Sequence, residues 1–203
     1  EEETESRLPE IVKNIALIYK ELGQNDKALA AIETARASNP DDVGLIITAA
    51  NIYFELDNKE AFKLAMSEAI EKEPNNPVLY YNLGVVSGEL GEKEAAVSYY
   101  EKSIELDPSN ENSYLNLVAL ILDGEQEIVN EMNNLGTSRS DNLRYDELKK
   151  VREDLYKQCV PILKDLIAIN NNVEAIRTLM NIYGTLGDNP GYVEMRNLLD
   201  QQE

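Results

Sequence analysis

A repeat with a period of 34 residues constrains the fold more than any other feature of this 203-residue sequence. Pro40, Pro74 and Pro108 follow one another at this step, and Tyr19 recurs as Tyr53. A fixed period of this size is typical of proteins built from stacked copies of one small module, because each copy buries its apolar face against its neighbours. The sequence therefore predicts a repeat architecture.

Each repeat reads as two short helices joined by a turn. In the first repeat, Ile11, Ile15, Ile18 and Leu22 follow helical spacing, and a second such run spans 28–35. Gly, Asn and Asp fill the breaks between the runs, and the prolines end the helix before them. The predicted breaks within repeats are segments 23–26, 57–59, 91–93 and 187–190, the last of which places a proline at a first helical position.

These repeats resemble tetratricopeptide repeats (TPR), whose pattern is a large residue, Leu-Gly or Leu-Ala and Tyr in the first helix, then Ala, a large residue, Ala and a closing Pro. Two positions depart from the pattern: Phe62 replaces a small residue, and Ser87 replaces the usual Tyr. The matching residues of the first three repeats are Ile15, Ala16, Tyr19, Ala28, Ile32, Ala35 and Pro40; Ala49, Ala50, Tyr53, Met66, Ala69 and Pro74; and Tyr80, Leu83, Gly84, Ala96, Tyr100, Ser103 and Pro108.

The resemblance implies an all-α fold, an α-solenoid of stacked antiparallel helix hairpins in a right-handed superhelix. The first helices would line a concave groove. Small residues at Ala16, Ala50 and Gly84 would let the helices of a hairpin approach closely. We expect one domain over 1–203, with repeats at about 9–42, 43–76, 77–110, 111–172 and 173–203.

The fourth repeat departs from the period, because an insertion of roughly 28 residues displaces its second helix to about 155–169. The extra segment, about 125–154, has helical spacing on both sides of a break at 136–138, which predicts a projecting helical hairpin. Pro161 predicts a kink in the long helix that follows. Segment 139–164 is neutral to basic. It is either a solvated helix with i,i+4 ion pairs such as Asp146 to Lys150 and Glu153 to Lys157, or a docking arm for an acidic partner or for the acidic body of another copy.

The groove predicted from this resemblance mixes apolar and amide side chains, which suits an extended peptide or a helix of a partner protein. Phe54 and Tyr81 are the expected anchors, although Tyr81, Asn82 and Asn116 also have a purely structural explanation, because generic repeats carry these residues. The full set of predicted groove residues is Lys13, Leu17, Lys20, Ile47, Asn51, Phe54, Tyr81, Asn82, Val85, Leu115, Asn116, Ala119, Arg177 and Asn181.

Some members of this family bind a peptide's terminal carboxylate through a clamp of Lys, Asn and Arg side chains. Lys13 matches one cation of the clamp. Leu17 stands where the clamp has Asn, and Val78 and Asn82 stand where it has two further cations. The sequence therefore does not predict a carboxylate clamp.

Composition argues against catalysis and against several kinds of ligand. The chain has no His and a single cysteine, Cys159, which is expected to be a buried apolar residue. With 38 acidic and 19 basic residues the net charge is −19, which disfavours nucleic acid and anionic membranes as partners. The acidic group Asp123, Glu125, Glu127 and Glu131 matches no calcium loop and is expected to be a solvated face. We expect no cofactor and no metal.

The sequence thus predicts a non-catalytic scaffold that binds a protein or peptide partner, with self-assembly through the inserted hairpin or the solenoid ends as the alternative. Acid-base chemistry by carboxylates is a third and weaker interpretation. No segment is long and apolar enough for a membrane span, and no secretory signal is present, so a soluble chain is expected. The chain begins at Glu1 without Met, which suggests a processed or excised fragment, and a bacterial cell envelope and the cytoplasm both remain open.

Overall fold

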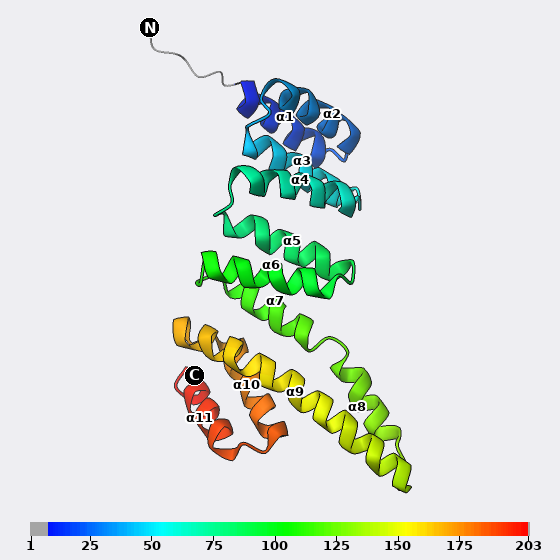
Figure 1. Ribbon diagram of the computed structural model, residues 1–203. Helices are drawn as coiled ribbons and strands as arrows, with labels where there is room; N and C mark the ends of the chain where they lie inside the picture. Colours follow the sequence, from blue (N-terminus) through cyan, green and yellow to red (C-terminus); the bar gives the residue numbers. More distant parts are fainter. Residues whose placement is uncertain (1–7, 203) are drawn as a thin grey trace. The chain divides into compact units, whose positions relative to one another are not determined.

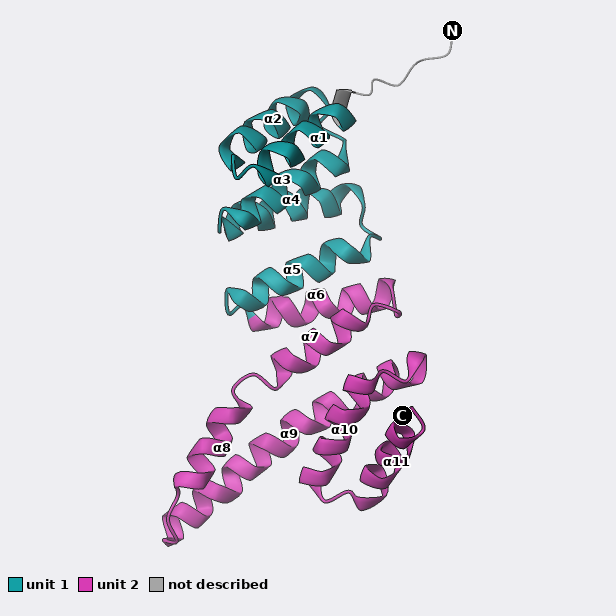
Figure 2. Ribbon diagram, turned by 180° about the vertical axis from the view of Figure 1, so that it is seen from behind, with its two compact units in different colours: residues 1–92 teal, residues 93–203 magenta. Residues whose placement is uncertain are grey.

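The computed structural model describes residues 8–202, and in this range it is built from helices that follow one another in the order of the sequence (Figure 1). The chain forms two compact units, which Figure 2 distinguishes by colour: unit 1 comprises residues 1–92 and unit 2 residues 93–203. The all-α fold that the sequence predicts is confirmed. The expectation that all 203 residues form one domain stays a prediction.

Residues 8–92, the described part of unit 1, contain five helices, and the helix ends fall at the predicted breaks. Gly23 has φ +68°, a left-handed conformation that favours glycine, and it ends the first helix. Asp42, Asn58 and Asn76 each accept a hydrogen bond from a backbone N–H in the first turn of the helix that follows. The helices of unit 1 are α1 (Leu8–Glu21), α2 (Asn25–Ser38), α3 (Val43–Glu55), α4 (Lys59–Lys72) and α5 (Pro77–Glu89).

The core of unit 1 follows the repeat pattern. Three residues of α2 pack against three residues of α3, and all six are buried. They are Ala28, Ile32 and Ala35 of α2 and Leu45, Ala49 and Ile52 of α3. The residues predicted to permit close approach are also buried, and they are Ala16 on α1, Ala50 on α3 and Gly84 on α5. Burying small side chains at these positions brings the helix backbones together, while the larger aliphatic residues fill the space between hairpins.

Unit 2 combines regular helix pairs with one long helix. The helices are α6 (Lys93–Leu106), α7 (Glu111–Ile121), α8 (Glu125–Asn134), α9 (Arg139–Asn170), α10 (Val173–Leu186) and α11 (Asn189–Asp200). Pro190 lies in the first turn of α11, as predicted. The core consists of buried residues from α7, α9, α10 and α11. The polar side chains Glu194, Arg196, Asp200 and Gln201 are exposed, as expected of a closing repeat.

Helices α8 and α9 form the projecting hairpin that the sequence predicts, and α8 lies along the N-terminal half of α9 in both ribbon views (Figures 1 and 2). The turn at 135–138 contains the predicted break, and Ser138 caps α9 in a capping box with Asp141. The inserted segment is continuous with the second helix of the fourth repeat, because α9 runs unbroken through Pro161 to Asn170. The interpretation of 125–154 as an insertion stays a prediction.

Candidate functional site

A pocket of about 290 Å³ in unit 1 brings together five of the predicted groove residues. Two come from α3, namely Asn51 and Phe54, and three from α5, namely Tyr81, Asn82 and Val85. Helix α4 packs on both α3 and α5, so it holds the two walls of the pocket in place. The helix-pair architecture therefore aligns side chains that are about one repeat apart in the sequence.

The floor of the pocket is aromatic and aliphatic. Phe62 projects from α4 between the two walls, and its ring centroid lies 5.6 Å from that of Phe54 with the planes inclined by 56°. Phe62 is buried, whereas 41% of Phe54 is exposed, so the pair has a fixed inner ring and an accessible outer ring. Val86, also buried, completes the floor. An aromatic pair in this tilted geometry offers a rigid apolar surface to a ligand.

Two amide side chains supply polar groups at the mouth of this apolar pocket. Asn51 and Asn82 form no side-chain hydrogen bond with any other residue of 8–202, so each has donors and an acceptor available to a ligand. None of the seven described lining residues carries a formal charge. The pocket therefore suits an uncharged, largely apolar group flanked by a peptide backbone.

Ion pairs join the helices around the pocket. Lys20 of α1 lies 2.8 Å from Glu55 of α3, and Lys59 of α4 lies 3.0 Å from Glu89 of α5. All four side chains are partly exposed, and pairs of this kind stabilise a fold by about 0 to 1 kcal/mol each. Their main consequence is that charged side chains on the helices around the pocket are neutralised by partners within unit 1.

The remaining predicted groove residues lie outside the pocket. In unit 1, Lys13 is half-buried with its ammonium against Gly44 at the start of α3, Leu17 is exposed, Lys20 is in the ion pair with Glu55 and Ile47 is half-buried. In unit 2, Leu115 packs partly against the core, Asn116 is half-buried, and Ala119, Arg177 and Asn181 are exposed.

Sequence reasoning did not identify Phe62 and Val86 as part of the site. Phe62 was noticed only as a departure from the repeat pattern, in a second helix that was not expected to face the groove. That departure was the available signal, because a large aromatic residue in place of a small one must occupy space between neighbouring first helices. Val86 carried no comparable signal.

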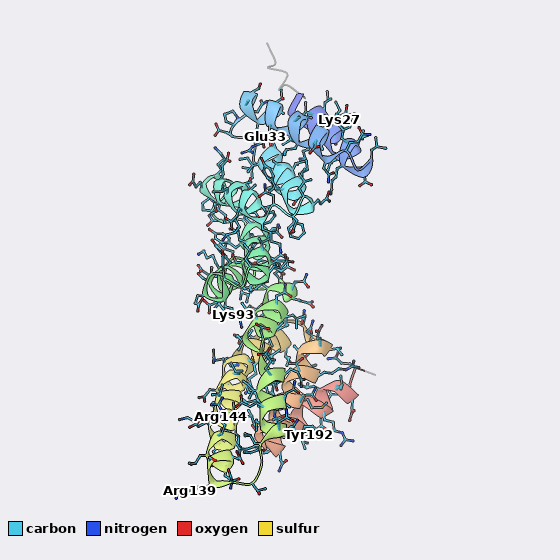
Figure 3. The ribbon with its side chains drawn as sticks, turned by 90° about the vertical axis from the view of Figure 1, so that its right-hand side faces the viewer. Lys27, Glu33, Lys93, Arg139, Arg144 and Tyr192 are labelled. Carbon is cyan, nitrogen blue, oxygen red and sulfur yellow. The ribbon has the colours of Figure 1, made fainter. Side chains whose placement is uncertain are left out.

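Four positive charges of the hairpin in unit 2 lie near carboxylates: Arg144 and Arg152 pair with α8, whereas Lys149 and Lys157 lie near carboxylates of α9 itself. Arg144, labelled in Figure 3, donates to Glu131 through Nε at 2.7 Å, which raises the pKa of the guanidinium and lowers that of Glu131. Arg152 donates to Glu125 at 2.8 Å, and the Tyr156 hydroxyl also donates to Glu125. Of the two expected i,i+4 pairs, Glu153 and Lys157 approach to 4.0 Å, whereas Asp146 and Lys150 form no ion pair within residues 8–202. These pairs favour the solvated, internally paired interpretation of this segment.

Three of the four residues of the acidic group near the hairpin form ion pairs. Asp123 pairs with Lys93 at 2.6 Å, while Glu125 and Glu131 hold the arginines of α9. Within residues 8–202, no group of three or more His, Cys, Asp or Glu side chains is placed to hold a metal ion. In the same range, no helix combines the length and apolar character that crossing a membrane requires.

Cys159 is fully buried in the core of unit 2, as predicted. Burial, followed by the negative charge of Glu125, raises the pKa of the thiol from 9.0 to about 11. The thiolate is the reactive form, so this environment suppresses nucleophilic chemistry at neutral pH.

We expect Cys159 to react with iodoacetamide at pH 8 at least about 100-fold more slowly in the folded protein than in urea. The rise in the thiol pKa from 9.0 to about 11 lowers the thiolate fraction by about that factor, and burial also blocks access of the reagent. Its raised pKa also favours the folded state below pH 9, and this contribution declines as the pH rises from 9 toward 11. Time-resolved mass spectrometry of the labelled chain measures the rates. Equal rates in both states would contradict the burial of the thiol.

Comparison with known proteins supports the repeat assignment. The tetratricopeptide-repeat family model matches residues 14–42 and 78–110, which lie within the first and third predicted repeats. The second predicted repeat, which the family model does not match, contains helices α3 and α4. No curated protein shows a significant sequence match.

Solved structures resemble the chain in fold at low sequence identity. A crystal structure of MamA protein has 16% identity and a TM-score of 0.64, covering 97% of this chain and 92% of that one. MamA from Desulfovibrio magneticus RS-1 has 12% identity and a TM-score of 0.62, covering 98% of each chain. The first TPR domain of Spaghetti (RPAP3), bound to the HSP90 peptide SRMEEVD, has 20% identity and a TM-score of 0.53, covering 64% of this chain and 99% of that one. The two family matches show that the chain contains tetratricopeptide repeats at residues 14–42 and 78–110, and the solved structures show that its paired-helix fold is that of such repeat proteins.

Proposed function

We propose that this chain is a non-catalytic scaffold that binds a partner protein through an extended peptide segment in the groove of unit 1. The observation that carries the proposal is the pocket between α3 and α5, where Phe54, Phe62 and Tyr81 surround a volume of about 290 Å³. A volume of this order accommodates one large apolar side chain, and rigid aromatic walls make such a contact a binding hot spot.

The two amides would fix the backbone of the bound segment. Asn51 and Asn82 lie on opposite walls of the pocket, and neither side-chain amide has a partner within residues 8–202. An amide can donate to a peptide carbonyl and accept from a peptide N–H at the same time. A segment seated between them would gain hydrogen bonds on both sides of the side chain that enters the pocket. Direction and register would follow from these bonds.

The ligand is expected to be an internal segment rather than a free carboxyl terminus. The RPAP3 domain is similar in fold and is bound to an HSP90 peptide, and the family's carboxylate clamp is a combination of cations and Asn. In this chain Leu17, Val78 and Asn82 occupy the clamp positions that would carry Asn and the two further cations. The pocket itself has no charged lining residue. Amidation of a ligand's carboxyl terminus should therefore leave its affinity unchanged.

A displayed library of random peptides, selected on the purified protein, tests the proposal. We expect selected peptides to share one large apolar or aromatic residue. Their affinity, measured by fluorescence anisotropy, should fall roughly 10- to 100-fold in the double variant Phe54→Ala with Tyr81→Ala, because two anchoring rings are lost.

The matched control is Leu64→Ala on α4, which removes an apolar side chain that is 73% exposed and lies outside the pocket. It should bind the peptides as the parent does. Unchanged affinity in the double variant, with folding verified by circular dichroism, would count against binding in this pocket.

A further inference from the structure

Helix α1 has an apolar face that is left exposed by the other described residues of unit 1. Ile11, Ile15, Ile18 and Leu22 lie on one side of the helix and its C-terminal turn, and their exposed fractions are 52%, 42%, 59% and 63%. The opposite side of the same helix supplies Ala16, fully buried, to the core. A helix that is apolar on two sides is typical of one that is packed on two sides. We call these four residues the α1 stripe.

The repeat period shows what this face does elsewhere in the fold. One period after the first three residues of the α1 stripe stand Leu45, Ala49 and Ile52 of α3, whose exposed fractions are 0%, 0% and 1%. In α3 these residues pack on the buried face of α2. The corresponding residues of α5, one period further, are Leu79, Leu83 and Val86, each 1% exposed. Ile11, Ile15 and Ile18 thus stand on the surface by which a first helix packs on a neighbouring helix. The counterparts of Leu22 are Leu56 and Leu90, which are 41% and 38% exposed, so Leu22 lies at the edge of this surface.

We infer that the α1 stripe binds the α1 stripe of a second copy of this chain, with the two helices antiparallel. Its residues are spaced by four, three and four, which is the spacing of a coiled-coil seam. A two-fold axis between Ile15 and Ile18 places Ile11 opposite Leu22 of the second copy and Ile15 opposite Ile18 of the second copy. The pattern is therefore self-complementary, as an isologous interface requires.

Charge favours pairing of two α1 stripes over a head-to-tail contact, in which the α1 stripe of one copy would pack on α11 of the next. The α1 stripe contains no charged residue, and the nearby cation Lys20 is held by Glu55 within unit 1. The closing helix α11 exposes Glu194 and Arg196, and seating these charges on an aliphatic face would leave them desolvated without a partner. A second α1 stripe brings only aliphatic groups to the seam.

The size of the stripe sets the expected strength. Its four residues expose roughly 400 Å² per copy, which is a large apolar patch for a monomer. Two contacting stripes, together with the residues that surround them, would bury on the order of 1,000 Å². That area is the lower limit for a specific interface, so we expect a weak, reversible dimer with a Kd on the order of 10 to 100 μM. Because each copy carries a net charge of −19, added salt should strengthen the dimer.

Sedimentation equilibrium of the full chain from about 5 to 500 μM tests this inference. We expect a monomer–dimer equilibrium that shifts toward dimer between about 50 and 300 mM salt, because screening weakens the repulsion. Ile18→Glu should weaken it at least 10-fold by burying two carboxylates at the seam. Leu64→Glu, at a leucine of α4 that is 73% exposed, should not weaken the dimer. A monomer at every concentration, or a dimer insensitive to Ile18→Glu, would overturn the inference.

A crosslinking measurement keeps the inference testable if Ile18→Glu impairs folding. The variant Ile11→Cys with Leu22→Cys should form interchain disulfides on mild oxidation. The two positions are about 16 Å apart along one helix, too far for a bridge within a chain. Absence of a crosslinked dimer would contradict the antiparallel arrangement.

The inference is independent of the proposed function. The pocket of Phe54, Phe62 and Tyr81 shares no residue with the α1 stripe, so Ile18→Glu should leave affinity for a single peptide unchanged. A dimer would carry two such pockets. Ligands with two binding segments would then bind the parent more tightly than Ile18→Glu, through avidity.

Discussion

The Phe62→Ala variant should lose about 3 to 4 kcal/mol of unfolding free energy, because replacing a buried Phe by Ala removes both its apolar burial and its packing. The side chain is 4% exposed and lies against Phe54. The tetratricopeptide pattern has a small residue at this position, so the pattern alone would predict a neutral or favourable change. The measurement is urea unfolding followed by circular dichroism.

Phe54→Ala is the matched control, since it removes the other ring of the same pair. Phe54 is 41% exposed, and its loss should cost less than about 1.5 kcal/mol. The Phe62→Ala variant should also bind selected peptides more weakly, because the floor of the pocket recedes. If Phe62→Ala were as stable as the parent, Phe62 could not be a packed support for the pocket.

The Gly191→Ala variant should lower the unfolding free energy by about 1 to 3 kcal/mol, because an added methyl group would overpack the contact between α10 and α11. A Cβ at Gly191 would lie 2.7 Å from a ring carbon of Tyr183. That ring has little room to move, since Tyr183 is 5% exposed and the Lys164 ammonium lies 5.8 Å from its centroid. Differential scanning calorimetry should report the loss as a lower Tm.

Gly184→Ala, in the same helix pair, is expected to have the opposite sign. Its added Cβ would meet the ring of Tyr192 at 3.5 Å, an ordinary van der Waals contact. Replacing a glycine by alanine within a helix stabilises it by up to about 1 kcal/mol. Equal effects of the two substitutions would mean that helix propensity, and not the Tyr183 contact, governs this pair.

Helix positions were predictable because their causes are local. A glycine with positive φ at Gly23 or Gly187, and an N-cap carboxylate at Asp42 or Asp188, act on residues within one turn. The period of 34 then implied that each hairpin packs as the previous one does. The burial of Ala16 followed from that regularity, whereas the choice of first helices as the lining of a groove came from the resemblance to tetratricopeptide repeats.

The candidate site was only partly predictable, because its depth depends on a contact between helices. Asn51, Phe54, Tyr81, Asn82 and Val85 were chosen from their place on first helices, and the structure gathers them in one pocket. The floor comes from a second helix that the repeat pattern assigns to packing alone. Whether the ring of Phe62 fills the core or supports a pocket depends on how far apart α3 and α5 stand, which no local pattern encodes.

The sequence by itself determined the helices, their pairing and the acidic, histidine-free chemistry of the chain, since these depend on neighbours within a turn or on a fixed period. Tertiary structure decided which charges of the hairpin find partners, as when Arg144 meets Glu131 thirteen positions away. It also decided that the apolar face of α1 is open while the same face of α3 is closed. The physical reason is that burial is a property of what lies opposite a residue, so among the described residues the same apolar pattern is buried on α3 and exposed on α1.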